Sequence, residues 1–125
     1  MIRDYRGSDY DRVVEIFRQR EYEFKLPDLD SPLMLTRKVV VDSDDVVRIA
    51  AFARLQVNAY LLIDDTWATP QGRLDSIGMI QDAMTERCRF FGVDEASAQV
   101  HPRFARRLKK IGWRFAPGIT VARNL

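Results

Sequence analysis

Apolar residues recur along the chain at two spacings, and these spacings predict both helices and strands. The first helical segment has apolar positions at i, i+3, i+4 and i+7, with charged residues between them. These positions are Tyr10, Val13, Val14 and Phe17. Ser8 or Asp9 precedes the stripe and can cap the first free amides of a helix. The pattern therefore predicts a helix that begins after these residues.

Strand-like patterns precede and follow this helix. Residues 1–5 form a short apolar start that predicts an edge strand, and residues 38–41, 46–52 and 55–63 predict three consecutive strands. The last of these alternates between apolar and polar positions and becomes apolar on both faces over residues 60–63. We therefore expect three strands that follow one another and pair through tight turns.

The second half of the chain predicts two more helices and the closing strands. One helix spans residues 76–91 and ends at Gly92, and the other runs from Pro102 to Gly112. Residues 93–100 predict a short strand, and residues 113–115 and 119–122 predict a closing hairpin around Pro117 and Gly118. This order predicts an α/β (α+β) fold with a mixed, mostly antiparallel central sheet flanked by helices.

Composition agrees with one globular domain that spans residues 1–125. Hydrophobic residues make up 46% of the 125 positions and charged residues 30%, and the formal net charge is only +2. The single Cys88 excludes an internal disulfide and a cysteine-based metal cluster. No signal peptide and no apolar run long enough to span a bilayer is visible, so we expect a cytoplasmic protein without a membrane partner.

The junction between the third strand and the second helix carries the strongest chemical signal. A helix start presents free amides and a partial positive charge, which suit a phosphate group. Gly72 and Gly78 allow close approach to the backbone, and Arg73 adds a cation. These features predict an anion site over residues 70–78, although an ordinary helix cap is the alternative explanation.

The same junction resembles the acetyl-CoA loop of the GNAT superfamily of N-acetyltransferases. The family pattern is Gln or Arg, two residues, Gly, one residue, then Gly or Ala. Arg73, Ser76 and Gly78 stand at these positions, with Ser76 in place of the first Gly. The order of elements also fits the family over the whole chain, and residues 111–113 (Ile-Gly-Trp) stand where the family has an apolar residue, Gly and Phe. Within the family, residues 24–29 and 106–113 are similar to short GNAT-like proteins of phages and prophages.

The resemblance implies a cosubstrate and an acceptor. The cosubstrate is acetyl-CoA or another acyl-CoA, with no metal, and an amine on a small molecule or a peptide attacks the thioester directly. The implied cofactor-binding residues are Leu62, Ile63, Arg73, Leu74, Asp75, Ser76, Ile77 and Gly78. The acceptor itself cannot be read from the sequence.

The resemblance also implies a base and an acid. Asp64 and Asp65 are candidate bases, although aspartates are also common in solvated turns. Leu108 stands where the family has its proton-donating Tyr, and it cannot donate a proton. Tyr60 and His101 are the remaining candidate donors, His101 also being a candidate surface or capping residue. A catalytically degenerate acyl-CoA-binding or protein-interaction module is therefore the alternative to an active enzyme.

A basic run near the C-terminus leaves further partners open. Six basic residues and no acidic residue lie between Arg103 and Arg114. They are typical of the solvated face of a helix, but they can also attract the 3′-phosphate of CoA or an acidic partner. No specific nucleic-acid motif is present, so an accessory role on nucleic acid is a weaker hypothesis. The oligomeric state stays open, a homodimer included.

Overall fold

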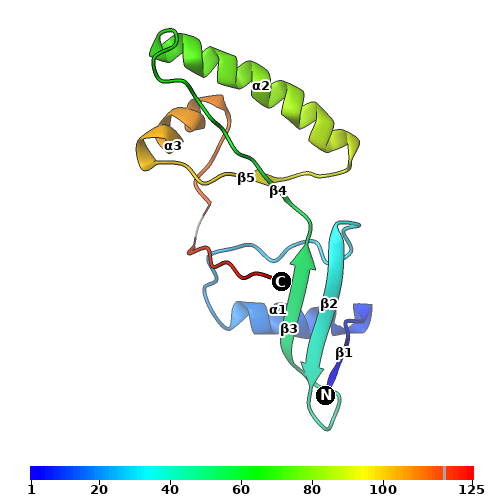
Figure 1. The fold of residues 1–125 in the computed structure, drawn as a ribbon. Coiled ribbons are helices and arrows are strands. Elements are labelled where there is room, and N and C mark those ends of the chain that lie inside the picture. Colours follow the sequence, from blue (N-terminus) through cyan, green and yellow to red (C-terminus); the bar gives the residue numbers. More distant parts are fainter. Residues whose placement is uncertain (117) are drawn as a thin grey trace. The chain divides into compact units, whose positions relative to one another are not determined.

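The protein has an α+β fold that contains three α-helices in the part described by the structure (Figure 1). This computed structural model describes residues 1–116 and 118–125. The elements follow in the order β1 (Ile2–Asp4), η1 (Gly7–Asp9), α1 (Tyr10–Arg18), β2 (Met34–Val41), β3 (Val47–Arg54), β4 (Val57–Asn58), α2 (Pro70–Phe90), β5 (Ala96–Ser97), α3 (Pro102–Leu108) and η2 (Lys109–Ile111). The contacts cluster in two units, which we call the first unit (residues 1–55 and 118–125) and the second unit (residues 56–116). A single domain over residues 1–125 thus stays a prediction.

The first unit is an antiparallel sheet with α1 packed on it. The strand order is β1-β2-β3, with Ile2 opposite Val40 and Val40 opposite Ile49. Val39, Val41 and Val47 are the buried centre of its core, and Ile16 of α1 packs against them. The predicted helix, edge strand and first two strands are therefore confirmed, although β2 begins at Met34 rather than at residue 38.

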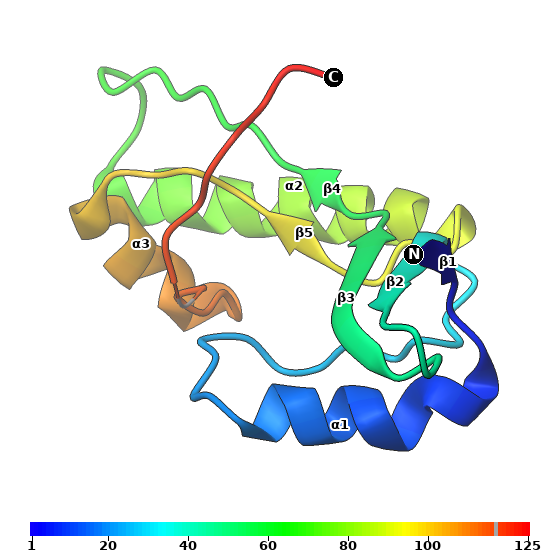
Figure 2. The same ribbon diagram turned by 90° about the horizontal axis from the view of Figure 1, so that it is seen from below.

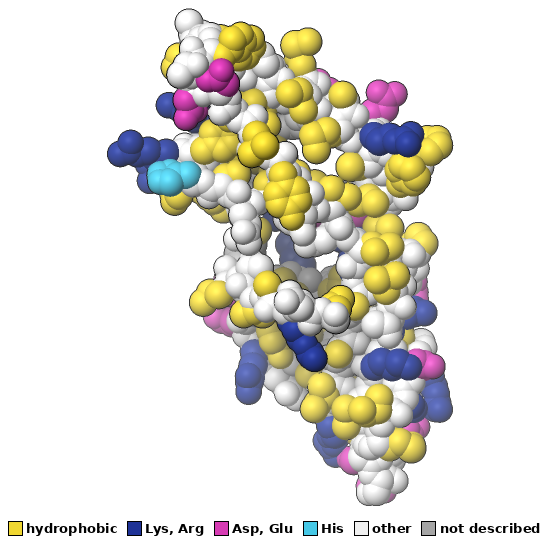
Figure 3. Space-filling model, viewed as in Figure 1, with side chains coloured by type: hydrophobic (Ala, Val, Ile, Leu, Met, Phe, Trp, Pro, Cys, Tyr) yellow, Lys and Arg dark blue, Asp and Glu magenta, His cyan; other side chains and the backbone are white. Residues whose placement is uncertain are grey.

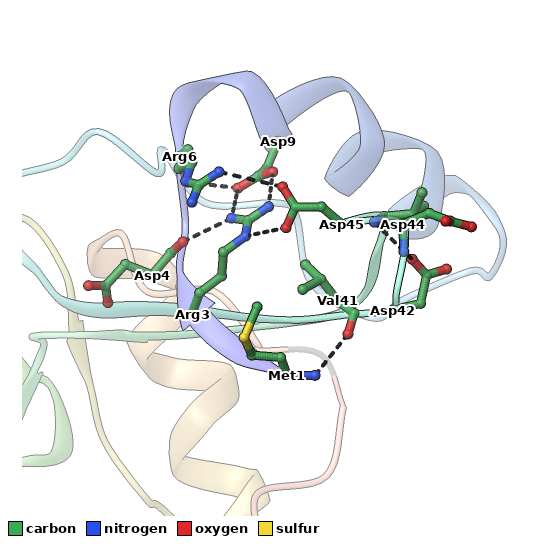
Figure 4. Close-up of polar contacts among 10 residues, drawn as sticks. Met1, Arg3, Asp4, Arg6, Asp9, Val41, Asp42, Asp44 and Asp45 are labelled. Carbon is green, nitrogen blue, oxygen red and sulfur yellow. Dashed lines mark hydrogen bonds and ion pairs between the residues drawn. The ribbon is translucent and has the colours of Figure 1, made fainter.

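An ion cluster joins β1, the start of α1 and the turn between β2 and β3 (Figure 4). The Arg3 guanidinium donates to both carboxylate oxygens of Asp9, over 2.8 and 2.9 Å, and its Nε donates to Asp45 over 2.9 Å. The Arg6 amide donates a further bond of 2.8 Å to Asp9, which is only 7% exposed. The hydrogen bonds from Arg3 are the main reason that the pKa of Asp9 is lowered, to about 2.

This cluster predicts a specific loss of stability in acid. The pKa of Asp9 in the folded protein lies below its unfolded value of 3.8. The contribution of Asp9 to the free energy of unfolding is therefore fully present above pH 3.8. The contribution is then lost as the pH falls through about 2. Urea unfolding of the protein and of Asp9→Asn at several pH values should show a stability difference that shrinks between pH about 5 and about 2. A stability difference that stayed constant over this pH interval would contradict the lowered pKa of Asp9.

The second unit is built around a very short parallel strand pair. β4 and β5 pair at Val57 with Ala96 and at Asn58 with Ser97, and the Ala59 amide donates to the Ser97 carbonyl over 2.7 Å. Beyond this point the two segments separate: the first leads to the start of α2 and the second to the start of α3 (Figures 1 and 2). Both helices begin at a proline, with Thr69 and His101 as their capping residues.

Several predicted boundaries in the second half are wrong. The strand predicted over residues 55–63 contains only residues 57–58, because no described strand pairs with the chain beyond Ala59. The strand predicted over residues 93–100 is likewise reduced to β5. The closing hairpin is absent, since residues 113–115 and 119–122 form no strand and Pro117 lies outside the described residues. Two separate sheets are found among the described residues where one mixed sheet was expected.

Exposed apolar side chains explain part of the difference between the predicted and the observed strand at residues 55–63. Tyr60 is 84% exposed and Leu62 is 96% exposed, although both belong to the apolar run that predicted a buried strand. Apolar side chains also gather on the surface over α2 and the segments beside it (Figure 3). Among the described residues, no helix combines the length and the hydropathy that crossing a bilayer requires.

Candidate functional site

An apolar cavity lies in the second unit, among β4, β5, α2 and α3. Its volume is about 210 Å³. Residues 57–61 and residues 93–98, which are joined by the short strand pair, both contribute to its lining. Side chains of α2, including Ile80 and Met84, and Phe104 of α3 complete the lining. The lining is mostly apolar, although Arg89, Asp94 and Glu95 also belong to it.

A partly buried pair of hydrogen bonds fixes one wall of this apolar cavity. The indole Nε1 of Trp113 donates to Oε1 of Gln81 over 2.7 Å, and Nε2 of Gln81 donates to the Ile111 carbonyl over 3.0 Å. Both ends of the Gln81 amide are therefore satisfied by protein groups. The hydrogen bond thus fixes Trp113, which lines the cavity. Leu108 also lines the cavity and is only 5% exposed.

A smaller hollow lies at the start of α2, and it contains two arginines. We call it the cationic hollow. It measures about 70 Å³ and is lined by Ile63, Asp65, Pro70, Arg73, Leu74, Ile77, Phe104 and Arg107. Ile77 and Phe104 also line the apolar cavity, so the two spaces share walls. The arginines come from different helices, and only one acidic side chain lies with them.

The predicted phosphate-binding segment, residues 73–78, lies inside α2 rather than ahead of it. The helix begins at Pro70, where Thr69 Oγ1 accepts a hydrogen bond from the Gly72 amide over 3.1 Å. The Arg73 amide already donates to the Thr69 carbonyl over 2.9 Å. The backbone amides beyond it belong to the helical ladder. The helix start predicted at residue 76 is therefore wrong. The first amides of α2 belong to the turn that begins at Thr69.

Arg73 has a structural role in addition to its position in the cationic hollow. One of its terminal nitrogens, Nη1, donates to the carbonyls of Trp67 and Ala68, over 2.8 Å in each case. Ala68 has a φ of 55°, a left-handed conformation that alanine rarely adopts. Arg73 thus holds the strained turn that precedes α2.

The other predicted cofactor residues divide into two groups. Ile63, Leu74 and Ile77 line the cationic hollow together with Arg73. Leu62 is almost fully exposed, Asp75 accepts a bond of 2.8 Å from Gln71, and Ser76 Oγ donates to the Gly72 carbonyl over 3.0 Å. Leu62, Asp75, Ser76 and Gly78 line neither space.

Gly78 provides a direct check on the helical placement of this segment. A methyl group added to its Cα would meet no atom within 4 Å. Alanine is favoured over glycine inside a helix because it leaves fewer conformations to the unfolded chain. Gly78→Ala should therefore raise the free energy of unfolding by about 0.5 to 1 kcal/mol. Urea unfolding measures this change, and a clear loss of stability would show that residue 78 is not in an open helical position.

The candidate catalytic residues are also separated by the structure. Tyr60 contributes to the apolar cavity and Asp65 to the cationic hollow. Asp64 accepts bonds from the hydroxyl and the amide of Thr66, over 2.6 and 2.9 Å, and these bonds hold its pKa below the ordinary value. A carboxylate with a lowered pKa is a weak base, so the geometry favours a turn-forming role for Asp64.

His101 lies at the start of α3, where it is exposed and caps the helix. Its Nδ1 accepts a hydrogen bond from the Arg103 amide over 3.2 Å. His101 lines neither space, and its position matches the capping interpretation.

Sequence reasoning missed several residues of the two spaces. Arg107 and Phe104 of α3 lie three positions apart and therefore on one side of this helix, and both reach the cationic hollow. The basic run contained Arg107, but nothing in its spacing distinguished it from the other basic residues of that run. Gln81 was missed as the partner of Trp113, because their contact joins positions 32 residues apart.

Together, the two spaces suit a ligand that has a flexible apolar arm at one end and several negative charges at the other. The apolar cavity lies beside the cationic hollow, to which Arg73 and Arg107 contribute. Comparisons with known protein families, with curated proteins and with solved structures found no match for the chain.

Proposed function

We propose that the second unit binds acyl-CoA in the manner of a GNAT-like protein. The observation that carries this proposal is the shared wall between the apolar cavity and the cationic hollow. CoA has a long, flexible pantetheine arm and a phosphorylated end, and these two parts need two such environments side by side. A site for an ordinary apolar ligand would not need two arginines at its end.

Different residues would bind the two parts of CoA. Arg73 and Arg107 would bind the phosphates through charged hydrogen bonds, and the positive end of the α2 dipole would support them. Ala59 and Ala96 of the paired segments, together with Met84 of α2, would contact the pantetheine arm. When bound, acetyl-CoA supplies an acyl group that its thioester activates toward an amine.

Acetyl transfer to an amine is a second candidate function, and Tyr60 favours it. Tyr60 is one of the residues that line the apolar cavity, so its phenol would be within reach of the arm that carries the thioester. Leu108, which stands at the position of the family's proton donor, is buried and has no proton to give. Tyr60 would therefore have to act as the donor, with Asp65 of the cationic hollow as the base. The acceptor would be an amine on a small molecule or a peptide.

Calorimetric titration with CoA, pantetheine and adenosine 3′,5′-bisphosphate tests the binding proposal. We expect CoA to bind more tightly than either fragment, because only CoA occupies both spaces. Two control variants separate the contributions of these spaces. Ile80→Trp should weaken pantetheine more than the bisphosphate, and Arg107→Gln should do the reverse. Failure of CoA to bind at millimolar concentration would rule out the proposal.

Release of free thiol from acetyl-CoA across a panel of amines tests the transfer function separately. If Tyr60 donates a proton, Tyr60→Phe should lower turnover by about 100-fold while leaving acetyl-CoA affinity nearly unchanged. If no amine of the panel causes thiol release, acetyl transfer to these amines is excluded. The binding proposal would remain intact. Turnover that survived in Tyr60→Phe would exclude Tyr60 as the donor.

A further inference from the structure

The first unit contains a cavity that the proposed acyl-CoA site does not use. Its volume is about 420 Å³, which lies in the range of small-molecule sites. Helix α1, the segment of residues 22–27 and strand β3 line it. The lining is aliphatic and aromatic except for one residue, Lys25. All the lining residues belong to the first unit.

Three aromatic rings form one side of this cavity and hold one another in place. Phe17 and Tyr22 stack with their centroids 5.3 Å apart and an angle of 13° between their planes. The Phe24 ring lies 5.2 Å from Tyr22 and 5.8 Å from Phe17, tilted against both. Tyr22 is 42% exposed and Phe24 is 57% exposed, so part of this aromatic surface faces solvent and can receive another ring.

The charge at the cavity limits what kind of ring can bind. Lys25 is the only charged side chain in the lining, and it forms no ion pair within residues 1–116 and 118–125. A cation beside the rings repels a second cation and attracts an anion. The Lys25 ammonium is also on a long flexible stem, which can reach an anionic substituent at the edge of the cavity.

We propose that this cavity binds a flat aromatic molecule that carries a carboxylate. The ring system packs against Phe17, Tyr22 and Phe24, and the carboxylate pairs with Lys25. The aromatic contact supplies most of the affinity, because an ion pair at an exposed position contributes little. This site is independent of the proposed acyl-CoA site, since none of its residues belongs to the second unit.

NMR titration of the full chain with three naphthalene probes tests this proposal. The probes are naphthalene-2-carboxylate, neutral naphthalene-2-methanol and cationic 2-naphthylmethylammonium. We expect the carboxylate to bind most tightly and the cation least, with shifts of the ring resonances of Phe17, Tyr22 and Phe24. A Tyr22→Ala/Phe24→Ala variant should weaken all three probes by about tenfold or more. Circular dichroism should confirm that it retains its fold, because both side chains are substantially exposed.

A matched pair of charge variants tests the role of Lys25. Lys25→Gln should weaken the carboxylate about fivefold and leave the neutral probe unchanged. Arg20→Gln removes the same charge from an exposed residue outside the lining, and it should change neither affinity. Three results would overturn the proposal: no shift at millimolar probe, shifts confined to residues 56–116, or equal weakening by the two charge variants.

Discussion

Replacing Arg73 and Arg107 together by glutamine is expected to weaken CoA binding by about 100-fold. The two side chains are the only cations that line the cationic hollow, and each would donate charged hydrogen bonds to a phosphate. Removing such bonds costs about 1.5 kcal/mol or more for each arginine. Calorimetry measures the affinity, and the salt dependence of binding should fall in the same variant because fewer phosphate contacts remain.

A matched control separates the local contact from the loss of charge. Arg103→Gln/Arg106→Gln removes two positive charges from α3, at exposed positions outside the cationic hollow. We expect this control to change CoA affinity less than about threefold, because exposed charges at a distance are screened by salt. Arg107→Gln alone gives a further check, since Arg73 also holds the turn before α2. Equal effects of the two double variants would show that CoA affinity responds only to the net charge of the protein.

Replacing Asp9 by alanine is expected to lower the free energy of unfolding of the first unit by about 3 kcal/mol. Asp9 accepts three hydrogen bonds, two from the Arg3 guanidinium and one from the Arg6 amide. Its loss leaves the Arg3 side chain, which is 11% exposed, without its main partner (Figure 4). The strand β1, which holds only three residues, would then lose its link to α1.

Amide hydrogen exchange is the suitable measurement, because it reports the first unit separately. Val39 and Val41 lie at the centre of the buried core, so their exchange follows the opening of this unit. Asp44→Ala is the matched control: the same replacement at an exposed turn position close to Asp45. It should change the free energy of opening by less than about 0.5 kcal/mol. Similar losses in both variants would contradict the role assigned to the Arg3–Asp9 pair.

Local patterns predicted the first unit well because its elements obey local rules. The apolar stripe of α1 and the β-branched runs of β2 and β3 indicate burial, and the buried core is the one packed around Val39. The strand predicted over residues 55–63 failed because an apolar run indicates burial only if another element covers it. Leu62 remains exposed, and the chain beyond Ala59 has no partner strand among the described residues.

The candidate site was predictable only in part, for the same physical reason. A short motif located Arg73, Leu74 and Ile77, which line the cationic hollow, but it could not show that they lie within the helix. Arg107 reaches the same hollow through the packing of α3, and no local spacing encodes this contact. Polar residues at helix ends were ambiguous as well. His101 caps α3, a local role that a sequence cannot separate from a catalytic one.

A crystal structure of the full chain grown with CoA tests the central claim most directly. The account predicts density for the pantetheine arm in the apolar cavity, in contact with residues 59–61 and with Met84 of α2, and phosphate density within hydrogen-bonding distance of Arg73 and Arg107. Trp113 and Gln81 should keep their hydrogen bond in that complex, since it fixes the wall of the apolar cavity. Density for CoA at another surface, or an empty apolar cavity in crystals saturated with CoA, would contradict the account.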